Sequence, residues 1–134
     1  MQDCYDNSIL YTDYVVGELI ENLSHERSAI VYTSDHGLVK AKDTDEFYVH
    51  GANDFNVDGY KVPMLVWFSN YVNHRETGFD TKPYSIANNY ELVLDLMGVN
   101  VGQNLCASPL RHCQRENFYV MNANGDILSV EKLK

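Results

Sequence analysis

The sequence predicts a single α/β domain over residues 1–134, a sheet with flanking helices that is followed by a C-terminal β-hairpin. Three observations predict this fold class. An amphipathic helical pattern opens the chain, two continuous apolar runs are typical of buried strands, and a second helical pattern precedes a strong hairpin signal. The length of 134 residues suits one domain with a modest core, and a hydrophobic content of 45% is ordinary for a globular protein.

The first predicted helix runs from Asp6 to Leu23. Apolar side chains recur there at near-helical spacing, and Asp3 or Asp6 can cap the exposed N–H groups. A short connection leads to an apolar strand that starts at Ser28 and ends in a polar turn. A helix, a short loop and a buried strand are the parts of an α/β unit.

Residues 37–61 show no convincing periodicity and are rich in Asp, Asn, Lys and Gly. A loop of this length inside a compact domain is unusual and is often functional. A second apolar run follows over residues 62–68. Because Pro63 cannot donate a hydrogen bond to a ladder, we expect the strand to begin at or after it and to end before Ser69.

The last elements are a helix and a hairpin. The helix is predicted over residues 85–97, and Gly98 is placed to end it. Two short β-type runs, residues 118–121 and 127–130, flank an Asn-Gly pair, which is the strongest hairpin signal in the chain.

The charge balance argues against two classes of partner. Ten basic residues against nineteen acidic ones give a net charge of −9. Such a field repels phosphate backbones and gives no attraction to anionic membrane surfaces, so we expect no nucleic acid partner. No apolar run approaches the roughly 18 residues of a membrane span, and the N-terminus has no secretory signal, so the chain taken literally is expected to be soluble.

The three cysteines leave two interpretations open. Cys106 and Cys113 could form a disulfide that closes a small loop in an oxidising compartment. Cys4 would then be free or paired outside the chain. The alternative is three reduced thiols. None of the spacings predicts a zinc knuckle.

Asp35 and His36 are the first candidates for chemistry. A carboxylate oxygen and an imidazole nitrogen together suit zinc or manganese better than calcium. Neighbours in a strand point to opposite faces, so both can reach one ion only if the chain turns, and Gly37 permits a turn. Asp-His-Gly is equally an ordinary strand-ending turn. Ser34 lies in no Gly-x-Ser-x-Gly elbow and is not expected to be a nucleophile.

His50 is the third candidate, fourteen residues after His36 in the long polar loop. It could fold back over the sheet edge as a further metal ligand or as a donor to an anionic substrate. It could equally be a solvated loop histidine. The other histidines have no acidic or histidine partner at useful spacing and are expected on the surface: His25, His74 and His112.

Four motifs and a helix occur in a recognisable order: Tyr-Asp-Asn-Ser-Ile-Leu-Tyr-Thr-Asp-Tyr over residues 5–14, Tyr-Thr-Ser-Asp-His-Gly within 30–37, Tyr-Val-His-Gly over 48–51, Val-Pro-Met-Leu-Val-Trp over 62–67, and the helix of residues 88–99. In this order they resemble bacterial phosphoethanolamine transferases, which are sulfatase-like enzymes of the alkaline phosphatase superfamily. The resemblance covers roughly residues 5 to 100.

The resemblance implies a partial alkaline-phosphatase/sulfatase-like sandwich, with Asp35 and His36 as ligands of a catalytic zinc. His50 would hold the phosphoryl group or a second zinc. Enzymes of this family move phosphoethanolamine from phosphatidylethanolamine, the phospholipid donor, to lipid A or another glycan acceptor. They work at the periplasmic face of the inner membrane through a phosphorylated threonine, which zinc and histidines assist.

The chain departs from the family pattern in two ways. Leu38 stands where the family usually has Glu, and residues 39–44 replace a Gly-rich segment. The family's membrane helices, nucleophilic threonine and remaining zinc ligands precede the matched motifs and have no counterpart here. We therefore expect the C-terminal part of such an enzyme, which carries half a site and is inactive alone.

Three alternatives stay open: part of a sulfatase, part of a phosphoglycerol transferase of the same superfamily, and a non-catalytic domain that binds a metal or a partner. A domain of this kind would also expose a sheet edge, so self-association is expected.

Overall fold

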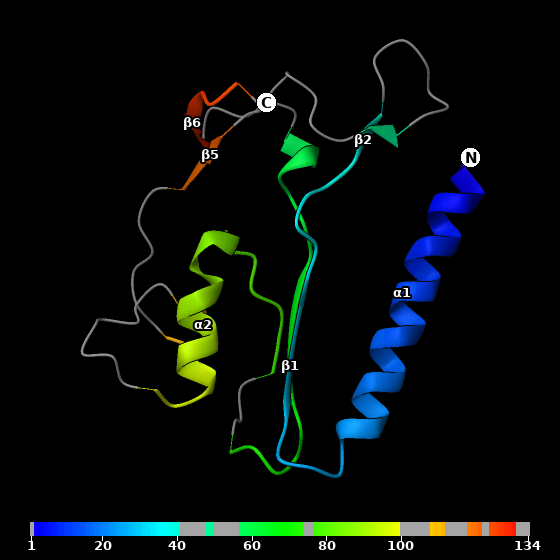
Figure 1. Cartoon of the computed structure of the whole chain (residues 1–134), viewed down its shortest axis with the longest axis vertical. Coiled ribbons are helices and arrows are strands. Elements are labelled where there is room, and N and C mark those ends of the chain that lie inside the picture. Colours follow the sequence, from blue (N-terminus) through cyan, green and yellow to red (C-terminus); the bar gives the residue numbers. More distant parts are fainter. Residues whose placement is uncertain are drawn as a thin grey trace. The chain divides into compact units, whose positions relative to one another are not determined.

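The computed structural model describes residues 2–40, 48–49, 57–73, 77–99, 108–111, 118–121 and 124–130. The chain divides into two compact units, Met1–Thr77 and Gly78–Lys134, and each is described by itself. The described strands form three antiparallel sheets of two strands each (Figure 1). The small α/β character agrees with the predicted class, whereas a sandwich built on one larger sheet is not confirmed.

Helix α1 spans Gln2–Leu23 and opens the first unit as one continuous helix (Figure 1). It begins four residues earlier than predicted, with Asp3 in its first turn, where a carboxylate interacts favourably with the helix dipole. Apolar residues recur along α1 between acidic ones. No helix in the described ranges is both long and apolar enough to cross a membrane.

Two serines connect α1 to the first sheet. The Ser28 hydroxyl donates to the carbonyl of Leu23, the last residue of the helix, over 2.7 Å. The Ser28 carbonyl accepts the Ser69 N–H at 3.0 Å, and the Ser28 N–H donates to the buried Ser69 hydroxyl at 3.2 Å. These bonds fix the point at which the first strand begins.

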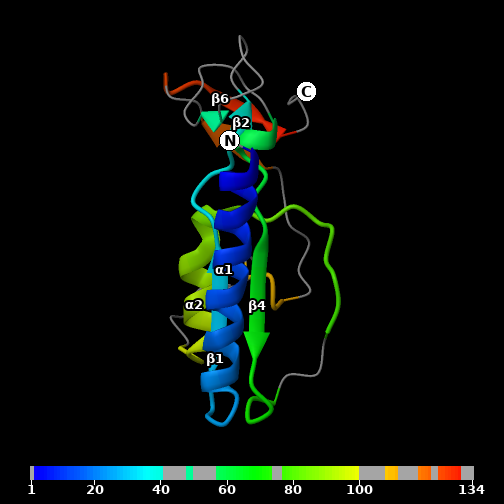
Figure 2. The same ribbon diagram turned by 90° about the vertical axis from the view of Figure 1, so that its right-hand side faces the viewer.

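Strands β1 (Ala29–Thr33) and β4 (Met64–Phe68) form the first sheet. They pair antiparallel, with Ala29 opposite Phe68 and Thr33 opposite Met64, and lie side by side in Figure 2. Both predicted strands are confirmed, and Pro63 lies just outside β4, as expected from its missing N–H. The pairing places the chain segment after Thr33 beside the start of β4.

The predicted aperiodic segment contains short elements that the sequence did not indicate. Strands β2 (Val39–Lys40) and β3 (Tyr48–Val49) pair antiparallel, and a 3-10 turn, η1, spans Val57–Gly59. Strands of two residues are too short to show a period, so no pattern could predict them. Within the first unit, the rings of Tyr5 in α1 and Tyr48 in β3 stack with centroids 4.8 Å apart.

The second unit contains the predicted second helix, whose first part is a 3-10 turn. A 3-10 turn, η2 (Ile86–Asn88), leads into α2 (Asn89–Leu96), whose Leu92 is fully buried. Gly98 adopts a φ of 66° and donates its N–H to the Asp95 carbonyl, which ends the helix as predicted.

The predicted hairpin is also confirmed. Strands β5 (Tyr119–Met121) and β6 (Ile127–Ser129) pair antiparallel, and Gly125 between them has a φ of 86°. This left-handed conformation is the reason that the Asn-Gly pair predicted a turn here.

A carboxylate with little exposed surface joins α2 to residues 108–111. The Asp95 side chain is 9% exposed and accepts hydrogen bonds from the fully buried Ser108 hydroxyl at 2.8 Å and from Arg111 Nε at 2.9 and 3.0 Å. Arg111 Nη2 completes the bidentate pair. The Arg111 guanidinium lowers the pKa of Asp95, and the Ser108 hydroxyl acts in the same direction.

Of the three cysteines, the structure describes Cys4. Cys4 is exposed and its thiol is free. Cys106 and Cys113 lie outside the described residues, so their disulfide stays a prediction.

Candidate functional site

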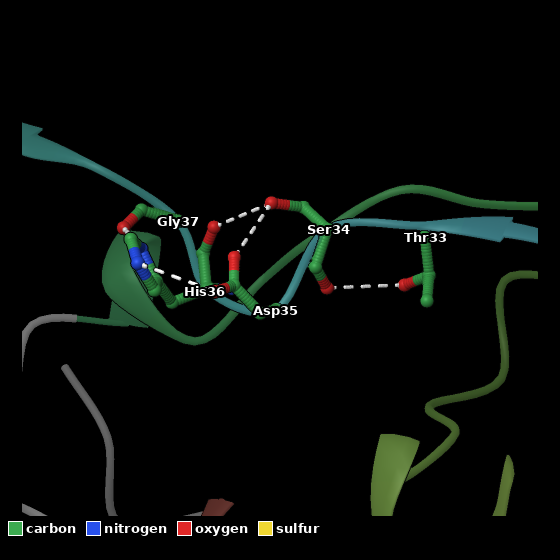
Figure 3. Close-up of polar contacts among 5 residues, drawn as sticks. All are labelled: Thr33, Ser34, Asp35, His36 and Gly37. Atoms are coloured by element: carbon green, nitrogen blue, oxygen red, sulfur yellow. Dashed lines mark hydrogen bonds and ion pairs between the residues drawn. The ribbon is translucent and has the colours of Figure 1, made fainter.

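The chain leaves β1 through a tight turn that is held by side chain to backbone hydrogen bonds (Figure 3). The Ser34 hydroxyl donates to the His36 carbonyl at 2.8 Å, and the His36 N–H donates to Asp35 Oδ1 at 2.9 Å. The first bond joins the residues on either side of Asp35, and the second joins the Asp35 carboxylate to the next residue. The turn therefore replaces the extended conformation in which neighbouring side chains point to opposite faces.

The turn brings the Asp35 carboxylate and the His36 ring together. Asp35 Oδ2 lies 3.6 Å from His36 Nε2, and the two side chains are 85% and 47% exposed. Two ligands of one tetrahedral zinc, each bonded at about 2.0–2.1 Å, lie roughly 3.3 Å apart. Without any large movement, this oxygen and this nitrogen could bind one ion.

The contact between the His36 ring and the Gly37 carbonyl also suits a metal ligand. Nδ1 lies 3.0 Å from the Gly37 carbonyl oxygen. Because a carbonyl oxygen only accepts, this bond requires the proton on Nδ1 and leaves the lone pair of the neutral ring on Nε2. Metal-binding histidines are usually oriented in this way, with the second ring nitrogen donating to a carbonyl or carboxylate.

Gly37 is required here because there is no room for a side chain. A Cβ on Gly37 would lie 2.1 Å from the Asp58 carbonyl oxygen and 3.2 Å from Gly59 Cα. The Gly37 N–H donates to the Gly59 carbonyl at 2.9 Å, so η1 packs directly against the turn. The φ of Gly37 is not positive, so its conformational freedom, which the sequence suggested, is not what the turn uses.

His50 lies outside the described residues, and its predicted role stays a prediction. The residue before it, Val49, pairs with Val39 across β2 and β3.

At the turn, the described residues supply two potential metal ligands, Asp35 and His36. Nowhere in the described ranges do three His, Cys, Asp or Glu side chains meet in a group that could hold a metal ion. His25 is exposed, as expected, and His74 and His112 lie outside the described residues. A complete tetrahedral centre would need further ligands.

Sequence reasoning missed two parts of this arrangement. Ser34 was considered only as a nucleophile, although a serine directly before a turn commonly bonds to nearby backbone. The Asp58-Gly59 dipeptide is an ordinary turn signal, but its contact with Gly37 is long-range and leaves no mark in the sequence.

Comparison with known proteins places the turn within a matched region. The family model described as Sulfatase matches residues 1–99, which include the turn. YhbX of Escherichia coli, whose name describes it only as a transferase, is 35% identical over 134 residues, covering 98% of this chain and 25% of YhbX. No solved structure matches the chain significantly.

Two further relatives have names that state an activity. Phosphoethanolamine transferase EptA of Salmonella typhimurium is 33% identical over 126 residues, covering 83% of this chain and 23% of EptA. Kdo(2)-lipid A phosphoethanolamine 7''-transferase of the same organism is 31% identical over 71 residues, covering 52% of this chain and 12% of the relative. The chain thus spans about a quarter or less of the length of these relatives.

Proposed function

The chain belongs to the sulfatase family, and from this premise we propose that it carries part of the zinc centre of a phosphoethanolamine transferase. The names of two relatives support the reaction class, and one of them also names a lipid A acceptor. The proposed reaction moves phosphoethanolamine from a phospholipid donor to lipid A or a related glycan. It would take place at the periplasmic face of the inner membrane.

One observation carries the proposal for this chain's own residues. Asp35 Oδ2 and His36 Nε2 lie 3.6 Å apart, while Asp35 Oδ1 accepts the His36 N–H and His36 Nδ1 bonds to the Gly37 carbonyl. Each side chain thus uses one polar atom to fix its orientation and turns the other toward its neighbour. The donor set, one carboxylate oxygen and one imidazole nitrogen, suits zinc.

Zinc bound there would stabilise negative charge on the transferring phosphoryl oxygens and favour ionisation of an attacking hydroxyl. In this scheme, Asp35 and His36 hold and orient the ion. His50 follows β3 in the chain and is the proposed donor to the phosphoryl group, or a ligand of a second ion. We assign no nucleophile to the 134 residues, and we propose that they catalyse no transfer alone.

The metal assignment is tested by isothermal titration calorimetry with zinc. The wild-type chain should bind zinc weakly, because two donors are only half of a tetrahedral set. The double variant Asp35→Ala with His36→Ala should show no heat of binding above dilution. Identical isotherms for the two proteins would exclude this pair as a zinc site.

A matched double variant controls for the loss of one carboxylate and one imidazole elsewhere. Asp80→Ala with His25→Ala removes one exposed residue of each kind, neither of which is part of the turn, and should leave the zinc isotherm unchanged. A phosphodiester hydrolysis assay with the pure chain completes the test. Robust turnover would show that these residues include a nucleophile and would contradict the proposed inactivity.

A further inference from the structure

The Ser34 hydroxyl makes the hydrogen bond that closes the turn of the candidate site. It lies 2.8 Å from the His36 carbonyl oxygen and 3.5 Å from Asp35 Oδ1 (Figure 3). A hydroxyl has one proton, so the short bond to the carbonyl is the well-formed one and the contact with the carboxylate is marginal. Ser34 is half-buried, and its own carbonyl accepts the Thr33 hydroxyl at 3.2 Å.

This bond acts on the two residues whose side chains must converge. In an extended strand, adjacent side chains point to opposite faces and could not bind the same ion. The Ser34 hydroxyl links the residue before Asp35 to the carbonyl of His36, which fixes the backbone on both sides of Asp35. The His36 N–H bond to Asp35 Oδ1 then orients the carboxylate within the same turn.

From these contacts we infer that Ser34 is a positioning residue for the Asp35–His36 pair, acting through the His36 backbone carbonyl. The inference rests on the proposed function, because it assigns Ser34 a purpose in metal binding rather than in stability alone. Ser34 does not touch the ion. Its hydroxyl holds the two donor atoms at the separation that one ion needs.

The serine is suited to this role by its size and its single donor. Alanine would keep the strand end but remove the bond to the His36 carbonyl, and the turn could then relax toward an extended conformation. Threonine would keep the hydroxyl and adds only a methyl group. Ser34→Ala and Ser34→Thr therefore separate the effect of the hydrogen bond from the effect of a changed side chain.

Zinc calorimetry on the full chain provides the first readout. We expect Ser34→Ala to raise the Kd for zinc roughly ten- to hundredfold, the range usual for loss of an outer-sphere partner. Ser34→Thr should stay within about threefold of the wild type. The matched control is Ser24→Ala, which removes a hydroxyl bonded to the Glu21 carbonyl at 2.7 Å before β1 begins, and should leave zinc binding unchanged. Equal zinc affinity in wild type and Ser34→Ala would overturn the inference.

A second readout works without metal. In ¹H–¹⁵N spectra of the metal-free wild type, the His36 ring should show the tautomer with the proton on Nδ1, as its bond to the Gly37 carbonyl requires. In Ser34→Ala we expect this signal to shift toward a mixture of tautomers, while the exposed His25 is unchanged. An unchanged His36 tautomer would contradict the positioning role.

The two readouts separate the inference from the proposed function. If the wild type binds no zinc, the zinc assignment of the pair fails, and the tautomer spectra still decide whether Ser34 positions His36. If the wild type binds zinc and Ser34→Ala binds it equally well, only the inference about Ser34 fails. A circular dichroism spectrum matching that of Ser24→Ala confirms that the alanine variant is folded.

Discussion

Asp35 and Asp95 are two carboxylates that the chain uses in opposite ways. The Asp95 side chain is 9% exposed, and both of its oxygens accept hydrogen bonds from Ser108 and Arg111. The Asp35 side chain is 85% exposed, with one oxygen on the His36 N–H and the other facing the His36 ring at 3.6 Å.

The difference distinguishes a structural carboxylate from a candidate ligand. The Asp95 oxygens accept hydrogen bonds that hold residues 108–111 against α2, and little of the Asp95 side chain is exposed to solvent. Asp35 holds only its own turn and presents an oxygen beside a second donor atom. A carboxylate with little exposed surface whose oxygens are all hydrogen-bonded contributes to stability, whereas an exposed carboxylate beside an imidazole can bind a metal ion.

The largest effect on stability is expected at Gly37, where the candidate site has no room for a side chain. Gly37→Ala would place a Cβ 2.1 Å from the Asp58 carbonyl oxygen, so the turn and η1 must move apart. We expect the free energy of unfolding to fall by about 3 kcal/mol, at the upper end of the cost of overpacking. Urea unfolding followed by circular dichroism measures this loss, and zinc calorimetry should show weakened binding.

Gly17→Ala is the matched control. A Cβ on Gly17 has no atom within 4 Å, and the residue lies inside α1. Because alanine favours a helix over glycine by about 1 kcal/mol, this variant should be as stable as the wild type or more stable. Equal stabilities for both glycine variants would contradict the contact between η1 and the turn.

An intermediate effect on stability is expected at Asp95, whose side chain has little exposed surface. Asp95→Asn keeps the size of the side chain but removes the charge that pairs with Arg111 and replaces one acceptor by a donor. We expect a loss of about 2 kcal/mol in unfolding free energy, within the range for an unsatisfied buried group. Zinc binding should not change. Asp80→Asn, at an exposed position, should alter stability by less than about 0.5 kcal/mol.

The smallest effect is expected from acid. The pKa of Asp95 in the folded chain lies below its usual value of 3.8, chiefly because Arg111 donates to it. The unfolded chain therefore takes up this proton first as the pH falls, and the stability that Asp95 supplies above about pH 5 is lost progressively toward more acidic pH. Urea unfolding between pH 7 and pH 3 should show the wild type and Asp95→Asn converging in stability. A difference that stays constant over this range would contradict the ion pair.

The regular elements were predictable because their signals are local. The helical pattern before Leu23, the apolar runs around Pro63 and the Asn-Gly turn each act over a few residues, and the structure confirms them. Strands β2 and β3 have two residues each, which is too short to show a period, so no local pattern marks them. The single domain over residues 1–134 stays a prediction.

The candidate site was predictable in its donors but not in its geometry. Asp35 and His36 were identified from their chemistry and their place after a strand, and the structure brings their donor atoms together. The Ser34 bond is local, and a serine directly before a turn could have indicated it. The close approach of Asp58 to Gly37 is a long-range contact, which no local pattern in the sequence marks. The zinc itself and the role of His50 stay predictions.

The direct succession of Asp35 and His36 in the chain has a consequence for metal-linked stability. Two donors separated by one peptide unit form a chelate whose closure costs very little chain entropy, in the folded or the unfolded state. An ion that binds both states with equal affinity stabilises neither over the other. Any stabilisation of the fold by metal must therefore come from the fixed turn or from a donor far away in the sequence.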